Sequence, residues 1–138
     1  MKHISFNPRF VNAAGNDLLS GKIHTIRKNY EWWKRYEGQD VALFTWEGTP
    51  YRPGSKHKVF CVKRIVSVQE VYFRRDKNDI GFFLTNDDLH PLDFQISYND
   101  GFHDEWGCDD FSSFLAWFRK KEYKPGKMAI IHFTNHRY

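Results

Sequence analysis

The sequence has only two cysteines, Cys61 and Cys108, and they lie far apart without forming a C-x-x-C pair. Neither a disulfide framework nor a cysteine-based zinc site is indicated, because both need more numerous or more closely spaced cysteines. The sequence also lacks a hydrophobic run of membrane-spanning length and the apolar stretch of a signal peptide near its start. We therefore expect free thiols in a soluble, cytoplasmic protein with no membrane partner.

Patterns that bind metals are equally sparse, since most of the seven histidines are scattered along the chain. His132 and His136 are four positions apart, which on an extended segment separates them by about 13 Å of strand rise. That separation is too long for two ligands of one ion. We expect no metal and no other cofactor.

Aromatic residues, in contrast, are abundant: they make up 18% of the 138 residues, with five Trp and thirteen Phe. Such side chains fill a core, and they also form platforms on which nucleobases stack. The formal net charge of +4 favours polyanionic partners without requiring them. The length fits a single domain over residues 1–138, and the composition leans toward RNA or a nucleoside as partner. It does not specify an oligomeric state.

Runs rich in β-branched and aromatic residues predict most of the secondary structure. We expect a short strand or an extended arm at residues 4–7, and strands at residues 23–26, 41–46, 58–65, 66–73, 80–85 and 128–133. The fourth and fifth of these runs form either one long strand or two strands separated by a bulge near Ser67. For residues 89–97 the pattern does not decide between strand and irregular structure, although His90-Pro91 argues against a helix continuing through it.

Helices are fewer, and the clearest covers residues 111–118, where Phe and Leu side chains recur at i, i+3, i+4 and i+7. Asp109 is placed to cap its N-terminus. A looser apolar pattern over residues 10–19 predicts a short helix that ends at Ser20-Gly21. Strands and helices together indicate an α+β protein built around a mixed or closed sheet.

One stretch, Leu18 to Arg27, concentrates an amine, a hydroxyl and a guanidinium within a turn and the start of a strand. Ser20-Gly21 is a turn signal, because Gly reaches positive φ at no steric cost. Side chains alternate along a strand, so Thr25 and Arg27 are expected on one face and His24 on the other. Lys22, at the end of the turn, is free of that alternation. Taken alone, these cations and this threonine are also compatible with a solvated edge strand, since short motifs match by chance.

The spacing Lys22-x-x-Thr25-x-Arg27 after Leu18-Leu19-Ser20-Gly21 resembles the signature of the ASCH domain, a relative of the PUA RNA-binding barrels. It is similar in particular to bacterial N4-acetylcytidine amidohydrolases, which carry Lys and Thr at this spacing. The family usually has one residue between the Gly and the Lys, whereas here Gly21 abuts Lys22. The resemblance spans roughly residues 6–133 and continues at 38–40 (Gly-Gln-Asp) and 100–102 (Asp-Gly-Phe).

The resemblance implies a PUA-like β-barrel of mixed strands with helices that flank a cleft. It also implies an acid just before the long helix, for which Glu105 is the first candidate and Asp104 the second. Desolvation disfavours a charged ammonium, so Lys22 in a dry cleft can act as a base toward the Thr25 hydroxyl. Arg27 can hold a carbonyl, a phosphate or a carboxylate through bidentate hydrogen bonds.

Residues 27–36 interleave aromatic and basic side chains, a pattern that can stack bases and neutralise phosphates together. Beside Arg27 and Asp104, the candidates for substrate binding are Tyr30, Trp33, Lys34 and Arg35. An equally weighted interpretation is a short helix that places Trp32 and Tyr36 in the core and its cations in solvent.

Three functional hypotheses follow. The first is a metal-independent amidohydrolase that deacylates N4-acetylcytidine or a similar nucleoside, with Lys22 as base, Thr25 as nucleophile and Glu105 as proton donor. The second is a non-catalytic RNA-binding module that uses the same cleft. The third is a ribonuclease in which His24 or His103 acts beside Lys22.

Overall fold

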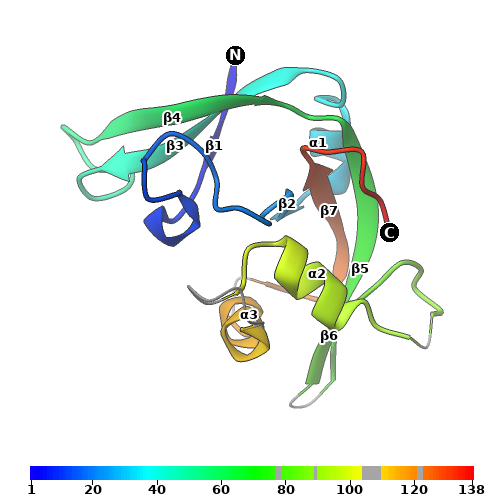
Figure 1. Ribbon diagram of the computed structural model, residues 1–138. Helices are drawn as coiled ribbons and strands as arrows, with labels where there is room; N and C mark the ends of the chain where they lie inside the picture. Colours follow the sequence, from blue (N-terminus) through cyan, green and yellow to red (C-terminus); the bar gives the residue numbers. More distant parts are fainter. Residues whose placement is uncertain (77–78, 89, 104–109, 121–122) are drawn as a thin grey trace.

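The computed structural model describes residues 1–76, 79–88, 90–103, 110–120 and 123–138 (Figure 1). Within them it contains seven β-strands, three α-helices and one 3-10 helix. In chain order these are β1 (Lys2–Ser5), η1 (Pro8–Phe10), β2 (His24–Lys28), α1 (Tyr30–Lys34), β3 (Asp40–Glu47), β4 (Lys56–Arg64), β5 (Ser67–Asp76), β6 (Asp79–Phe83), α2 (Asp93–Asn99), α3 (Phe111–Phe118) and β7 (Gly126–His132).

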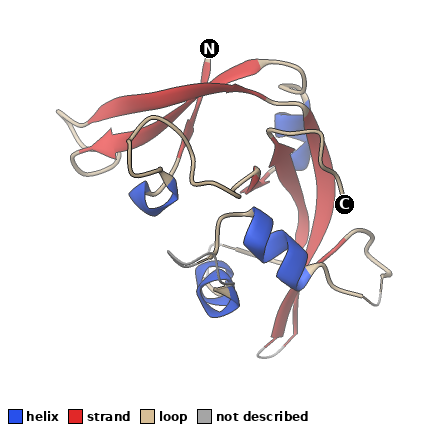
Figure 2. Cartoon of the chain, viewed as in Figure 1, coloured by secondary structure: helices blue, strands red, loops and turns tan. Residues whose placement is uncertain are grey.

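The strands form two sheets, as Figure 2 shows. One has the order β1-β3-β4, in which β1 runs parallel to β3 and β3 antiparallel to β4. The other has the order β2-β7-β5-β6 and is antiparallel throughout. The predicted run over residues 58–73 is thus two strands, and each belongs to a different sheet. The α+β class is confirmed, with hydrogen bonds that join the described strands into two sheets.

Strand β7 lies at the centre of the second sheet, between β2 and β5, and its middle residues are fully buried. Ala129, Ile130 and Ile131 expose none of their surface, because the sheet is covered on both faces. Helix α1 packs against β5 and β7, while α2 and α3 lie against each other and α2 contacts β6 (Figure 1). The core therefore extends from the first sheet through β7 to the two later helices.

Helix α3 follows the predicted pattern, with Phe114 and Phe118 almost fully buried. Its N-cap is Asp110, whose Oδ1 accepts a hydrogen bond from the main-chain N–H of Ser113 (3.4 Å), whereas Asp109 lies outside the described residues. Residues 89–97 were expected to be strand or irregular structure, and for their second half both alternatives are wrong, because helix α2 begins at Asp93. The helix starts two residues after Pro91, so it does not continue through the His90-Pro91 pair.

The predicted helix over residues 10–19 is wrong. Only η1 is helical there, and the chain continues as a loop closed by a bridge between Val11 and Leu18. The Asn12 side chain accepts a hydrogen bond from the main-chain N–H of Asn16 (3.1 Å), which competes with helical bonding. Gly15 adopts φ +76°, and the apolar spacing reflects a buried loop instead of a helix face.

None of the described helices is long and apolar enough to cross a lipid bilayer.

Candidate functional site

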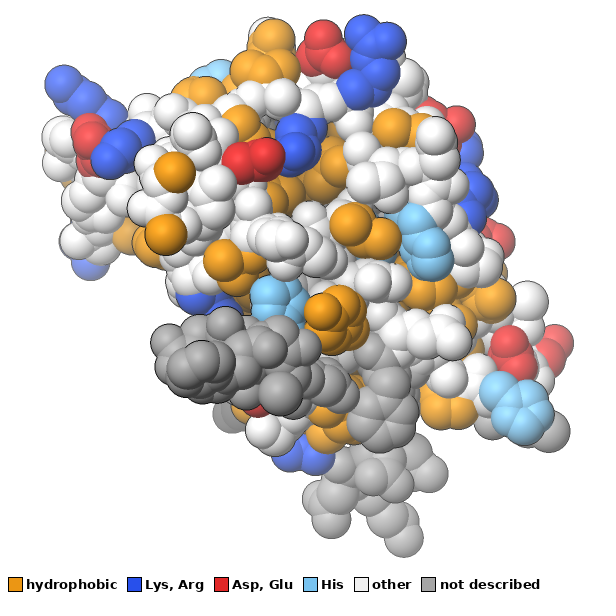
Figure 3. Space-filling view, viewed as in Figure 1, with side chains coloured by type: hydrophobic (Ala, Val, Ile, Leu, Met, Phe, Trp, Pro, Cys, Tyr) orange, Lys and Arg blue, Asp and Glu red, His pale blue; other side chains and the backbone are white. Residues whose placement is uncertain are grey.

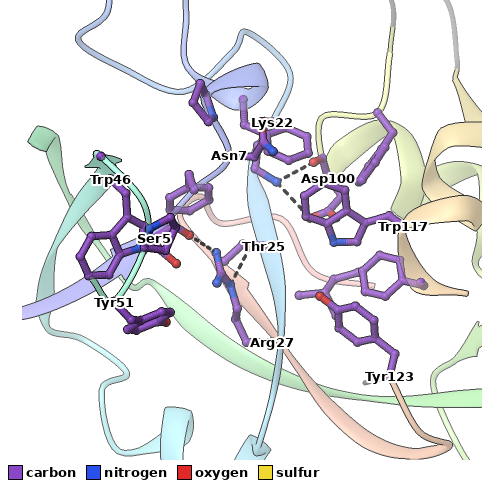
Figure 4. Close-up of a pocket in the computed structure, with 18 residues that line it drawn as sticks. Ser5, Asn7, Lys22, Thr25, Arg27, Trp46, Tyr51, Asp100, Trp117 and Tyr123 are labelled. Atoms are coloured by element: carbon purple, nitrogen blue, oxygen red, sulfur yellow. Dashed lines mark hydrogen bonds and ion pairs between the residues drawn. The ribbon is translucent and has the colours of Figure 1, made fainter. Parts of the chain in front are cut away.

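The predicted central stretch lines a cavity of about 520 Å³ that opens between the first sheet, η1 and α3 (Figure 4). Polar side chains from segments far apart in the sequence meet in it, and most of the rest of its lining is aromatic. The lining residues are Ser5, Phe6, Asn7, Pro8, Phe10, Lys22, Thr25, Ile26, Arg27, Trp46, Gly48, Pro50, Tyr51, Asp100, Phe102, Trp117, Phe118 and Tyr123.

Lys22 is buried, with 6% of its surface exposed, and Asp100 holds its ammonium through two hydrogen bonds. Nζ donates to the main-chain oxygen of Asp100 (2.5 Å) and to the carboxylate Oδ1 of the same residue (3.2 Å). Asp100 follows directly on α2, so the cation lies at the carbonyl end of that helix, where positive charge is favoured. A single residue thus supplies both a charge and a main-chain acceptor to the amine.

The close approach of Lys22 to this loop depends on Gly101. Gly101 has φ +89°, and a Cβ there would lie 2.9 Å from Lys22 Cδ and 3.1 Å from its Cβ and Cγ. Gly21 has φ +90° and turns the chain immediately before Lys22. The two glycines let the lysine stem lie flat against the Asp100-Gly101 backbone.

Burial is the main influence on the Lys22 ammonium and lowers its pKa, because desolvation penalises the charged form. The charge and hydrogen bond of Asp100 act in the opposite direction, while the cations of Arg27 and Arg9 lower the pKa further. Nζ also lies 4.4 Å from the centre of the Phe10 ring. Lys22 therefore gives up its proton more readily than an exposed lysine, as a general base requires.

Thr25 and Arg27 both line the cavity, as the alternation along β2 predicts, and they contact each other. The Nε–H of Arg27 donates to Thr25 Oγ1 (3.2 Å), and its Nη2 donates to the main-chain oxygen of Ser5 (2.5 Å). Because a guanidinium only donates, the hydroxyl proton of Thr25 is left for another acceptor. The adjacent positive charge favours an alkoxide or oxyanion at this position.

His24 points to the opposite face of β2 and is fully buried. Its Nδ1 lies 3.2 Å from Asp100 Oδ1, and its Nε2 lies 2.6 Å from the hydroxyl of Tyr138. Burial lowers the pKa of His24, and the hydrogen bond and charge of Asp100 offset this only in part. The ring is therefore neutral near pH 7, and Asp100 is contacted from both faces of the strand.

Aromatic side chains form two facing walls of the cavity. Trp46 and Tyr51 stand on one side of Lys22, Thr25 and Arg27, and Trp117 and Tyr123 stand on the other (Figure 4). Tyr51 leaves 86% of its surface exposed and has φ +61° in the loop between β3 and β4. Its ring centroid lies 5.0 Å from that of Trp46. A flat ring can enter between these walls and lie above the polar groups.

The predicted substrate-binding residues of α1 are not brought to this cavity. Trp33 is packed in the core, and Tyr30 is partly buried against the same core. Lys34 pairs with Glu37 (2.6 Å), and the Nε of Arg35 donates to the main-chain oxygen of Trp32 (3.4 Å). The helix therefore packs aromatic side chains against the core, as one interpretation held, but the buried one is Trp33, and Trp32 and Tyr36 are only partly buried.

The two predicted acids, Asp104 and Glu105, lie outside the described residues. The carboxylate that the described chain brings to Lys22 is Asp100, which was not predicted as a site residue. The Asp100-Gly101-Phe102 motif was the available signal, because the glycine marks a turn beside the acid. Its contact with Lys22 joins residues 78 positions apart, and local spacing does not reveal such a contact.

The chain turns after β7, so the extended spacing assumed for His132 and His136 is wrong. Their ring centroids lie 6.2 Å apart. Among the described residues, no group of three or more metal-ligating side chains gathers. Cys61 is a free thiol whose pKa burial raises to about 11.

Comparisons with protein-family models, with curated proteins and with solved structures found no match to this chain.

Proposed function

We propose that this chain is a metal-independent amidohydrolase that removes an acyl group from the exocyclic amine of a modified nucleoside such as N4-acetylcytidine. The observation that carries the proposal is the convergence of Lys22, Thr25, Arg27 and Asp100 in one aromatic-lined cavity. The resemblance to the ASCH amidohydrolases supplies the reaction class. A PUA-like barrel and action on a nucleoside or on RNA are parts of the same proposal.

Lys22 and Asp100 act as one acid–base pair, because their hydrogen bond lets one proton reside on either group. In the reactive form the amine is neutral and the carboxyl is protonated. Lys22 takes the hydroxyl proton of Thr25, and Oγ1 attacks the acyl carbon. Asp100 protonates the amine nitrogen as the C–N bond breaks, which leaves an acyl ester on Thr25 and the pair as ammonium and carboxylate.

Water completes the cycle. The Asp100 carboxylate takes a proton from a water molecule that attacks the ester carbon, and the Lys22 ammonium returns a proton to the departing Thr25 oxygen. The acyl group leaves as a carboxylic acid, and both members of the pair regain their starting forms. Arg27 stabilises the negative charge of each tetrahedral intermediate, because its guanidinium already donates to Thr25 Oγ1.

The aromatic walls account for the substrate class. A cavity of about 520 Å³ falls within the range of small-molecule sites and exceeds the volume of a nucleoside. Stacking on Trp46 and Tyr51 can hold any base, because every base has a flat aromatic face. The polar groups then face the substituent on the base, and the acylated amine sets the specificity.

The assay is acetate release from N4-acetylcytidine by the wild type and by Lys22→Met, Thr25→Val and Asp100→Asn. Each variant removes one proton-transfer or nucleophilic role, so we expect losses of at least about 100-fold. Lys34→Met is the matched control, because Lys34 is an ion-paired lysine outside the cavity. No turnover by the wild type, or undiminished turnover by Lys22→Met, contradicts the proposal.

The identity of the acid is tested with the same assay. Asp100→Asn removes the described carboxylate and preserves its size, whereas Glu105→Gln and Asp104→Asn remove the acids expected from the sequence. We expect only Asp100→Asn to abolish turnover. A large loss in Glu105→Gln together with an active Asp100→Asn assigns the proton donor to Glu105 instead.

A second candidate is RNA binding without catalysis, favoured by the exposed aromatic wall at Tyr51. Acidic and basic side chains lie interspersed among the described residues on the face shown in Figure 3, so the net charge of +4 forms no continuous basic patch there. This candidate predicts salt-dependent RNA binding that Arg27→Ala weakens and Lys22→Met preserves. Lys34→Ala and Arg35→Ala report whether α1 adds to that binding.

A further inference from the structure

His24 lies on the face of β2 that points away from the cavity, yet it contacts the same carboxylate oxygen as Lys22. Asp100 Oδ1 lies 3.2 Å from Lys22 Nζ and 3.2 Å from His24 Nδ1. The other ring nitrogen of His24 lies 2.6 Å from the Tyr138 hydroxyl. A continuous chain of hydrogen bonds therefore runs from Lys22 in the cavity through Asp100 and His24 to Tyr138.

The direction of each hydrogen bond follows from the donors available. Asn99 Nδ2 can only donate, and it lies 3.0 Å from the Tyr138 oxygen, which therefore accepts. The Tyr138 O–H then has two acceptors to choose from: His24 Nε2 at 2.6 Å and the main-chain oxygen of Gln95 at 3.5 Å. The O–H forms the shorter of these two hydrogen bonds, since a hydrogen bond of 3.5 Å between oxygens is weak. The hydroxyl donates to Nε2.

That direction fixes the histidine tautomer. A neutral imidazole carries one N–H, and with Nε2 accepting, the proton resides on Nδ1. The Nδ1–H then donates to Asp100 Oδ1, which also accepts from Lys22. Burial keeps the ring neutral by lowering its pKa. While the pair is present as ammonium and carboxylate, the opposite tautomer would aim a lone pair at the carboxylate oxygen, and the two would repel each other.

Tyr138 is itself held in place, so the tautomer does not depend on a loose side chain. The side-chain amide of Gln69 donates to the main-chain oxygen of Tyr138 (2.7 Å) and accepts from its main-chain N–H (3.1 Å). The same Gln69 oxygen accepts from His132 Nε2 (2.9 Å). Strands β5 and β7 therefore anchor the residue that orients His24.

We propose that His24 and Tyr138 are positioning residues for the Lys22–Asp100 pair. Tyr138 fixes His24 as the Nδ1–H tautomer, and this N–H holds the Asp100 side chain toward Lys22. Loss of the donor is expected to misplace the carboxyl relative to the amine. The catalytic part rests on the proposed function, whereas the tautomer follows from the geometry alone.

The pH dependence reflects every titratable or charged group around the ring. Lys22 and Asp100 face it from the loops before β2 and after α2, and Tyr138 and His136 face it from the segment after β7. His132, opposite it on β7, lies 5.5 Å away between ring centroids. Protonating His24 places a second cation beside Lys22, so activity is expected to fall at the acidic pH where the ring becomes charged.

The tautomer is tested by long-range ¹H–¹⁵N correlation spectra of the whole ¹⁵N-labelled chain, with the His24 signals assigned by His24→Asn. We expect a neutral Nδ1–H ring at pH 7. Tyr138→Phe removes the donor to Nε2, so it should mix the tautomers or raise the His24 pKa. Tyr98→Phe, on the exposed face of α2, is the matched control and should change neither.

A wild-type ring with the Nε2–H tautomer, or a charged ring at pH 7, overturns the proposal. So does a folded Tyr138→Phe variant whose His24 signals and titration match those of the wild type. These outcomes need no substrate, and therefore they hold whether or not N4-acetylcytidine is turned over.

The kinetic measurement is the pH profile of kcat. His24→Leu should lower kcat about tenfold, because the Asp100 carboxyl loses the donor that orients it, with KM changed less than about threefold. His24→Asn should recover part of that loss, because its amide can donate to Asp100 from near the position of Nδ1. If the wild type turns over and His24→Leu keeps the same kcat and pH profile, the positioning role fails. If the wild type does not turn over while the tautomer is as expected, the proposed function fails instead.

Discussion

Gly101 offers the sharpest test of how the fold holds Lys22. A methyl group at this position would lie 2.9 Å from Lys22 Cδ and 3.1 Å from Lys22 Cβ and Cγ. Real side chains do not sustain the first of these contacts and rarely show the other two, and the atoms involved include the Cβ of the lysine. Gly101→Ala must therefore move the Lys22 backbone or the loop after α2, and either movement stretches the contacts of Nζ with Asp100.

Two costs add in this variant. An L-residue at φ +89° carries roughly 1–2 kcal/mol of backbone strain. The overpacked contact adds about 1–3 kcal/mol if the core resists it. Gly38→Ala isolates the first cost, because Gly38 has φ +83° and no atom within 4 Å of the added Cβ. The difference between the two variants should therefore be about 1–3 kcal/mol.

Urea unfolding of both variants measures that difference, and acetate release measures its effect on the site. We expect Gly101→Ala to lose most of the activity at urea concentrations where it remains folded, while Gly38→Ala keeps it. Equal free energies of unfolding for the two variants, with equal activity, would show that the lysine stem does not depend on this glycine.

Two further predictions concern pH and the aromatic wall. Burial lowers the pKa of His132 from 6.5 to about 3, so the unfolded chain binds the proton first and stability is lost as pH falls below 6.5. Between pH 7 and pH 5 this residue should cost about 2 kcal/mol in urea unfolding, and His132→Gln should remove that part of the loss; an unchanged pH dependence contradicts the assignment. Tyr51→Ala should leave the free energy of unfolding within about 0.5 kcal/mol, since the side chain is 86% exposed, yet raise KM for the nucleoside about tenfold. An unaltered KM would remove Tyr51 from the binding wall.

The local parts of the fold were predictable because single segments determine them. The i, i+3, i+4 spacing gave α3, and the alternation along β2 placed Thr25 and Arg27 on one face. The helix predicted for residues 10–19 was wrong for the same reason. Phe10 and Leu18 are buried, but they are buried from a loop, and an apolar spacing does not distinguish these cases.

The candidate site was only partly predictable, because its described carboxylate comes from a loop that is distant in the sequence. Counting back from α3 selects Asp104 and Glu105 by their position in the chain. The contact between Asp100 and Lys22 instead depends on where α2 ends. The helix ends at Asn99, and Asp100 then lies against the turn before β2. The main-chain N–H of Ile23 donates to the oxygen of Asn99 (2.9 Å) and fixes that approach.

The register of β2 links the cavity to the chain of hydrogen bonds behind it. Thr25 pairs with Ile131 and His24 with His132 on β7, so neighbouring residues necessarily face opposite sides. A shift of one residue would place the imidazole in the cavity and the hydroxyl in the core. Asp100 is not on β2 but follows α2, and it lies next to the first residues of β2. Lys22 and His24 can therefore both contact its Oδ1, although they approach from different sides. The alternation that turns the Thr25 hydroxyl toward the cavity thus also places, on the buried face, the His24 nitrogen that contacts Asp100.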